Sequence, residues 1–120
     1  MHDYQMGAVE SRFADLIWEN EPISSTELTK RSEELFSWKK STTYTVLKRL
    51  CEKGIFQNVK GTVTSLLSRQ EFYSLQSEKF VEETFAGSLP AFLAAFTARK
   101  NLTPEEVAQL RRMIAEYEEG

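Results

Sequence analysis

The chain has 120 residues and a formal net charge of −3, with 41% hydrophobic and 28% charged residues. This length fits one main folding unit with an appendage and is too short for two independent enzyme domains. The single cysteine, Cys51, excludes an internal disulfide and a multi-cysteine zinc site. The single histidine, His2, leaves almost no basis for histidine-dependent catalysis. We therefore expect a non-enzymatic protein with neither a cofactor nor a metal site.

Hydropathy gives an expectation about location. The longest nearly apolar stretch, residues 89–96, is far shorter than the roughly 20 residues of a membrane span, and the first dozen residues lack the apolar segment of a signal peptide. We therefore expect a cytoplasmic protein without membrane insertion.

Charges are distributed unevenly along the chain. Residues 1–35 carry three basic and eight acidic groups, residues 36–69 seven basic and one acidic, and residues 70–120 five basic and nine acidic. Attraction to phosphates depends on charges within about 8 to 10 Å. The basic middle segment is therefore compatible with nucleic-acid binding although the whole chain is acidic.

Two helices are predicted before the basic segment. The first, over residues 8–20, has apolar side chains at the i, i+4, i+7 and i+8 positions of an amphipathic helix, which are Val9, Phe13, Leu16 and Ile17. Residues 20–22 break this helix, and Ser24 and Glu27 then have the spacing of a capping box. A second helix is therefore expected over residues 25–35.

A third helix and a β-hairpin are predicted within the basic segment. The helix follows a polar turn at residues 37–40, ends at Gly54 and has a buried stripe made of Thr43, Val46, Leu47 and Leu50. Residues 55–60 and 62–67 are rich in β-branched residues on either side of Gly61, which is typical of a hairpin. Three helices followed by a hairpin is the order of a winged helix, in which the second and third helices form a helix-turn-helix.

Three more helices are predicted after the hairpin, over residues 69–85, around residues 89–96, and from Pro104 onward, with Thr103 as N-cap. Ser68 and Glu71 form a capping box for the first of them. Their apolar stripes are more than this tail can bury against itself, so we expect a contact with a second copy. The residues expected in this dimer contact are Phe80, Phe85, Leu89, Phe92, Leu93, Phe96, Val107, Leu110, Ile114 and Tyr117.

The sequence thus predicts a mostly α-helical protein with two parts. Residues 1–68 are expected to form a winged-helix DNA-binding domain and residues 69–120 a helical dimerisation region, in which the last helix buries its apolar stripe. An alternative is that the tail helices pack back onto the winged helix.

The outward side of the third helix and the hairpin tip combine cations, which can contact phosphates, with donors and methyl groups, which can contact base edges. The candidate DNA-binding residues are Lys39, Lys40, Ser41, Thr42, Tyr44, Thr45, Lys48, Arg49 and Lys60. We expect Thr42, Thr45 and Arg49 nearest the bases and the lysines mainly at phosphates. Two alternatives remain: this face is only solvated surface, or the winged helix is a protein-interaction module that does not bind DNA.

Short motifs recur in a fixed order over nearly the whole chain from about residue 6. They are residues 10–18, Ser37-Trp38, Thr42, Thr45, Arg49-Leu50, Lys53-Gly54, residues 85–88, residues 102–107 and Leu110-Arg111-Arg112. Their order and spacing resemble the penicillinase repressor family of winged-helix regulators. This resemblance implies a transcriptional repressor that binds palindromic operator DNA as a homodimer.

The resemblance also bears on induction. In the beta-lactam branch of the family, a membrane sensor-protease cleaves the repressor at a bond preceded by Asn, in the helix that contains Phe96 here. The resemblance thus implies cleavage between Ala95 and Phe96 and a sensor-protease partner, although Ala95 departs from the family pattern. Copper-responsive relatives carry paired Cys-x-Cys motifs, which are absent from this chain.

Three positions near the expected interface also differ from the family. Thr43 occupies a position that is usually aliphatic, Tyr44 is bulky for a groove, and the wing over residues 60–68 is short. The operator sequence is therefore expected to differ from that of other members. Cys51 is expected to be half-buried filler, because a redox switch would need a lowered thiol pKa.

Overall fold

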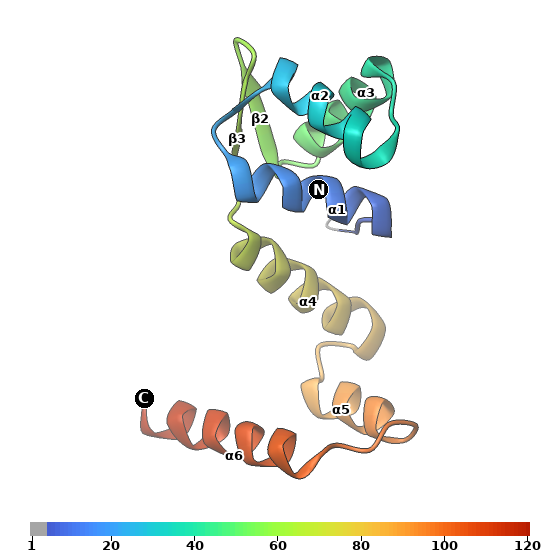
Figure 1. Cartoon of the computed structure of the whole chain (residues 1–120). Helices are drawn as coiled ribbons and strands as arrows, with labels where there is room; N and C mark the ends of the chain where they lie inside the picture. Colours follow the sequence, from blue (N-terminus) through green and yellow to red (C-terminus); the bar gives the residue numbers. More distant parts are fainter. Residues whose placement is uncertain (1–4) are drawn as a thin grey trace. The chain divides into compact units, whose positions relative to one another are not determined.

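The computed structural model describes residues 5–120, and these form helices α1 to α6 and strands β2 and β3 (Figure 1). A further strand of two residues, β1, completes a small sheet. His2 lies outside the described residues. The elements are α1 (Ala8–Asn20), β1 (Ile23–Ser24), α2 (Ser25–Phe36), α3 (Lys40–Glu52), β2 (Phe56–Val59), β3 (Thr62–Ser65), α4 (Arg69–Phe85), α5 (Leu89–Thr97) and α6 (Pro104–Glu119). This arrangement confirms the mostly helical winged-helix fold with a helical C-terminal region.

No helix within residues 5–120 combines the length and the apolar character needed to cross a membrane.

The residues group into two compact units, Met1–Lys79 and Phe80–Gly120. The first unit extends past residue 68, where the sequence predicted its end. Because the assignment of the two parts to DNA binding and dimerisation is a functional one, it stays a prediction.

The boundary between the two units lies inside α4, after Lys79, and the start of this helix contacts α1. Trp18 Nε1 donates to the Leu67 carbonyl at 2.9 Å, and the Trp18 ring lies 5.7 Å from that of Phe72, which is fully buried. The Arg69 guanidinium lies 5.7 Å from the centre of the Trp18 ring and pairs with Asp15 at 3.0 Å. Aromatic packing and an ion pair thus fasten the start of α4 to α1.

The hydrophobic core lies in the first unit. It is formed by side chains from α1, α2, α3, the sheet and the first turn of α4, namely Phe13, Ala14, Leu16, Ile17, Ile23, Leu28, Val46, Leu47, Leu50, Ile55, Phe56, Val63 and Phe72. Val9 was expected in the buried stripe of α1 but is 48% exposed. It lies in the first turn of α1, and burial on this helix begins one turn later, at Phe13.

The sheet has the strand order β1-β3-β2 and is antiparallel throughout. The sequence did not predict β1, which places Ile23 opposite Val63. The hairpin strands are shorter than the predicted residues 55–60 and 62–67. Lys60 (φ 52°) and Gly61 (φ 82°) form a two-residue turn directly after Val59, which ends β2 one residue early. At the other end of the hairpin, the Leu66 and Leu67 backbone N–H groups both donate to the Ile55 carbonyl, outside the strand ladder. Positive φ at both central positions is the geometry of a type I′ turn, which matches the twist of the flanking strands.

Helix ends largely follow the predicted signals. At the end of α3, Gly54 (φ 82°) donates to the Cys51 carbonyl and Ile55 donates to the Leu50 carbonyl, which is a Schellman motif. The capping boxes at Ser68 and Thr103 are complete, with both reciprocal hydrogen bonds.

The predicted capping box at Ser24 is only half formed. Ser24 Oγ accepts the Glu27 backbone N–H at 3.0 Å, but Glu27 Oε1 accepts from Arg31 Nε at 3.1 Å and does not return to the cap. The ion pair with Arg31, one turn along α2, therefore replaces the second bond of the box.

The second unit has little core of its own. Phe80, Phe85 and Phe92 form an edge-to-face cluster with ring centroids 5.7 to 6.1 Å apart. Neither α5 nor α6 contains a buried residue. The prediction that α6 buries its stripe is therefore wrong for a single chain: Val107 and Leu110 are partly covered, Ile114 is 59% exposed and Tyr117 is 88% exposed.

Candidate nucleic-acid interface

The outward face of α3 is open to solvent. Thr43, Val46, Leu47 and Leu50 point into the core. At about 3.6 residues per turn, the opposite side of the helix carries Ser41, Thr45 and Lys48, and all three are exposed. Two hydroxyls and a cation are therefore presented together on one uncovered helix face.

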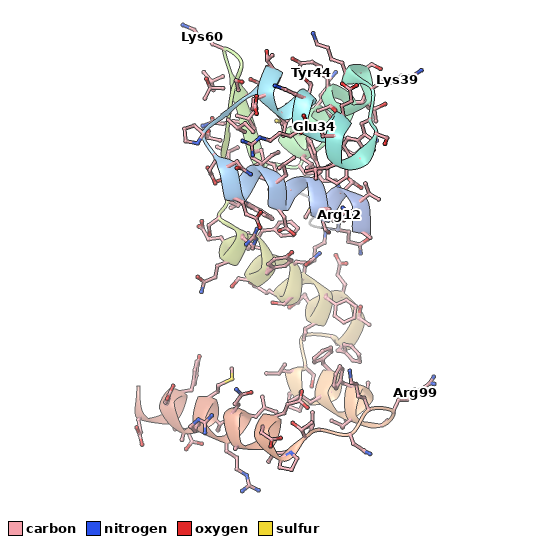
Figure 2. All side chains as sticks on the ribbon, in the orientation of Figure 1. Arg12, Glu34, Lys39, Tyr44, Lys60 and Arg99 are labelled. Carbon is pink, nitrogen blue, oxygen red and sulfur yellow. The ribbon has the colours of Figure 1, made fainter. Side chains whose placement is uncertain are left out.

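The N-terminus of α3 has features that favour an anion. Its N-cap is Lys39, which makes no side-chain capping hydrogen bond, and the first turn contains no acidic residue. Unpaired backbone N–H groups and the helix dipole make such an end attractive to phosphate. Lys39 and Lys60 project from the end of the first unit that lies away from α1 (Figure 2). Lys39 thus places a cation at the start of α3, and Lys60 places one at the hairpin tip.

Tyr44 connects α3 with two other elements. Its hydroxyl donates to Ser25 Oγ at 3.3 Å, and the Ser25 backbone N–H donates to the Gly61 carbonyl in the hairpin turn at 2.8 Å. Lys40 Nζ lies 5.9 Å from the centre of the Tyr44 ring. Half-buried Tyr44 therefore ties α3 to the start of α2, and through Ser25 to the hairpin.

Arg49 lies on a flank of α3 and is already paired. Its Nη1 atom is 3.6 Å from Glu10 Oε2 on α1, and Lys53 Nζ is 4.0 Å from the same oxygen. Glu10 was not predicted to lie in this region, because its proximity to α3 arises only when α1 packs there. Sequence pattern carries no signal for such a long-range ion pair.

The positive surface is consequently smaller than the charge count of residues 36–69 suggested. Arg49, Lys53 and Arg69 all pair with carboxylates of α1. Four cations of this segment are exposed and make no ion pair within the described part of the chain, namely Lys39, Lys40, Lys48 and Lys60. These lysines are the cations most available to a phosphate backbone.

Comparison with known proteins gives the family. A family model described as "Penicillinase repressor" matches residues 6–116. The chain belongs to the penicillinase repressor family. This confirms the resemblance found in the sequence and makes the protein a repressor of transcription.

Two relatives match this repressor along nearly its full length. A protein named "Penicillinase repressor" from Bacillus licheniformis is 25% identical over 117 residues, which cover 94% of this chain and 91% of the relative. The "Methicillin resistance regulatory protein MecI" of Mammaliicoccus sciuri is 20% identical over 115 residues, covering 92% and 94% respectively.

Cys51 of the repressor does not have the properties of a reactive thiol. It is half-buried near the end of α3. Burial, and secondarily the charge of Glu52, raise the pKa of the Cys51 thiol above its usual value. Because the thiolate is the reactive form, this environment disfavours redox chemistry at Cys51.

The repressor's Ala95 and Phe96 lie within α5, which is capped by Ser88. Ala95 is exposed and Phe96 is 41% exposed. The peptide bond between them is held in a helix, so a protease would require local unwinding. Because α5 has no buried residue, such unwinding disturbs mainly the ring contacts of Phe92 with Phe85 and Phe96.

Proposed function

We propose that this repressor binds a palindromic operator as a homodimer, with α3 of each copy in a major groove. The observation that supports this most directly is the uncovered side of α3, where Ser41, Thr45 and Lys48 are exposed together. A major groove is wide enough to admit one helix, and hydroxyl, methyl and cationic groups are the chemistry that base edges and phosphates accept.

In this arrangement the four exposed lysines contact the DNA backbone. Lys39 and Lys40 lie at the start of α3, beside backbone N–H groups that have no side-chain cap. Lys60 extends from the hairpin turn (Figure 2). Thr45 Oγ1 donates to the Ser41 carbonyl at 2.9 Å, which leaves its oxygen lone pairs and its methyl group for a base edge.

A second copy would complete the C-terminal unit. The apolar residues of α5 and α6 are partly or largely exposed in one chain, with Leu89 at 56% and Ile114 at 59%. Burial of such stripes against a partner supplies favourable free energy at about 25 cal/mol per Å². The peptide bond between Ala95 and Phe96, within the same unit, is where a membrane sensor-protease would act to release the repressor.

A DNA titration tests the interface. Lys60→Ala and Lys48→Ala should each lower the slope of log affinity against log salt by about one unit, because each removes one phosphate contact. Lys30→Ala is the matched control, since Lys30 is exposed on α2 and lies outside the proposed interface. The operator itself would come from selection of genomic fragments bound by the full chain.

Unchanged DNA affinity and salt slope in both lysine variants would contradict the placement of α3 and the hairpin. Failure of the selection to yield a palindromic consensus would instead favour a winged helix that binds another protein.

A further inference from the structure

A three-residue charge cluster joins the first turn of α1 to the last turn of α3. The carboxylate oxygen Oε2 of Glu10 lies 3.6 Å from Arg49 Nη1 and 4.0 Å from Lys53 Nζ. This oxygen is buried and accepts no hydrogen bond. The Glu10 side chain is 21% exposed, so its negative charge acts mainly on these two cations.

The two cations of the cluster differ in their freedom. Lys53 is 16% exposed and also donates to the Gln5 carbonyl at 2.7 Å, which anchors it. Arg49 is 51% exposed and follows Thr45 by one helical turn, so it stands at the edge of the outward face of α3. A guanidinium has five N–H donors, and the long contact with Glu10 leaves most of those on Arg49 unused.

In the ion pair the Arg49 charge lies beside α1. Attraction to Glu10 holds the guanidinium on the α1 side of α3, away from the line of Ser41, Thr45 and Lys48. A cation at the edge of a recognition helix meets the sugar-phosphate backbone, whereas one in the middle meets base edges. The sequence-based expectation that Arg49 lies nearest the bases stays a prediction, and the pair with Glu10 favours a phosphate contact instead.

We propose that Glu10 is a positioning residue that raises DNA specificity through Arg49. Glu10 holds the Arg49 guanidinium where it would meet the sugar-phosphate backbone of DNA. It also offsets part of the positive charge at this end of α3. Non-specific binding depends almost entirely on phosphate neutralisation, so this offset weakens it. In the operator complex the base contacts of Ser41 and Thr45 fix α3 in the groove and limit how far Arg49 can turn toward a phosphate, whereas in a non-specific complex α3 is free to adjust toward the backbone. The offset therefore weakens non-specific binding more than operator binding, and the ratio of operator to non-operator affinity rises.

This inference rests on the proposed function. A purely structural role for Glu10 would change the stability of the first unit but not the ratio of the two affinities or the salt slope. Those two quantities are therefore the readouts, with thermal unfolding measured alongside.

The experiment compares the unmodified full chain with the variants Glu10→Gln, Arg49→Gln and the double variant. The affinity of each protein is measured over a range of salt for operator DNA and for a non-operator duplex of equal length. Glu10→Gln should bind the non-operator duplex about threefold more tightly and steepen its salt slope by about 0.9. Operator affinity should rise less, and both effects should disappear in the Arg49→Gln background.

Glu34→Gln is the matched control, because Glu34 is exposed on α2 and has no ion pair among residues 5–120 (Figure 2). It removes one negative charge from the same unit, so it should change both affinities slightly and equally. Glu10→Asp retains the charge but shortens its reach, and it should shift the affinity ratio in the same direction as Glu10→Gln by a smaller factor. If Glu10→Gln does not fold, the affinity ratio of Glu10→Asp serves as the test.

The proposal is overturned if Glu10→Gln raises both affinities by the same factor, as a general surface charge would, or if its effect persists without Arg49. Where Glu10→Gln does not fold, an unchanged affinity ratio in Glu10→Asp overturns it. A wild-type chain that binds neither duplex would refute the proposed function instead, so the two failures are distinguishable.

Discussion

Thr43 lies in the middle of the buried side of α3, where its side chain is fully excluded from solvent. Its hydroxyl oxygen has no hydrogen-bond partner. Burial of an unpaired hydroxyl costs about 1 to 3 kcal/mol relative to a paired or solvated one. Thr43 is therefore a local weakness in the core of the winged helix.

Replacement of Thr43 by Val should stabilise the protein. Valine has nearly the same shape and a similar helix propensity, but carries no group that needs a partner. We expect Thr43→Val to raise the free energy of unfolding by about 1 kcal/mol, measured as a shift of the urea midpoint. Thr42→Val, on the exposed side of the same helix, should give no comparable gain. A less stable Thr43→Val variant would show that the hydroxyl has a partner, such as a buried water.

Arg49 shows the limit of sequence reasoning for a single residue. Its position on α3 was predicted correctly, and so was its location outside the core. The direction of its side chain was not predictable, because it depends on Glu10, which is 39 positions earlier in the chain. Helical periodicity places a side chain on a face but does not say which neighbour will meet that face.

At the scale of elements, α6 is maintained by local signals. It has no buried residue, so tertiary packing within one chain contributes little to it. Its start has a threonine N-cap, a proline in the first turn and a complete capping box. In this box Thr103 Oγ1 accepts the Glu106 backbone N–H at 3.1 Å, and Glu106 Oε1 accepts the Thr103 backbone N–H at 2.9 Å. These short-range bonds explain why its start was predictable.

The capping box should make α6 sensitive to acid. The hydrogen bonds that Glu106 accepts from the Thr103 backbone and side chain hold the pKa of its carboxyl below the ordinary value. Because the pKa is lowered in the folded helix, the stabilisation is present at neutral pH. Its loss begins near the ordinary glutamate pKa of about 4.3 and continues as the pH falls through the lowered value.

We expect Glu106→Gln to reduce this acid-dependent loss of helix, measured by circular dichroism between neutral and acid pH. Glu105→Gln is the control, since Glu105 is an acidic neighbour in the same turn that takes no part in the capping box. Identical acid profiles for Glu106→Gln and the wild type would contradict this role of the carboxylate.

For the whole molecule, the second unit poses the main physical question. Val107, Leu110, Ile114 and Tyr117 are spaced three, four and three residues apart, which is the spacing of a coiled-coil seam. A single chain leaves most of this seam in water, with Ile114 59% and Tyr117 88% exposed. A second copy offers an identical seam and is the partner that we propose.

Ile114→Glu should therefore dissociate the proposed dimer. Each copy would lose the burial of one isoleucine side chain, about 2 kcal/mol, and a buried carboxylate would add a further penalty. Sedimentation equilibrium should show a change from twice the chain mass to the chain mass, with weaker binding to a palindromic operator. Gln109→Glu, at an exposed position outside the stripe, should remain dimeric. A wild-type protein that sediments as a monomer would refute this prediction.

Several features were determined by the sequence alone. The predicted bounds of α1 and α4 agree with the structure, and so do the complete capping box at Ser68 and the glycine end of α3 at Gly54. Apolar periodicity and helix caps depend on residues within one or two turns of each other. They can therefore be identified without knowledge of the fold.

Other features were decided only by the tertiary structure. The pairing of Ile23 with Val63 created β1, and the packing of α1 near the end of α3 gave Arg49 its partner Glu10. The first unit extends into α4, as far as Lys79, and the start of that helix packs on α1 through the contact between Trp18 and Phe72. Each of these depends on which surfaces of distant segments come together, and a strand of two residues or a single long-range ion pair is too small to leave a periodic signal in the chain.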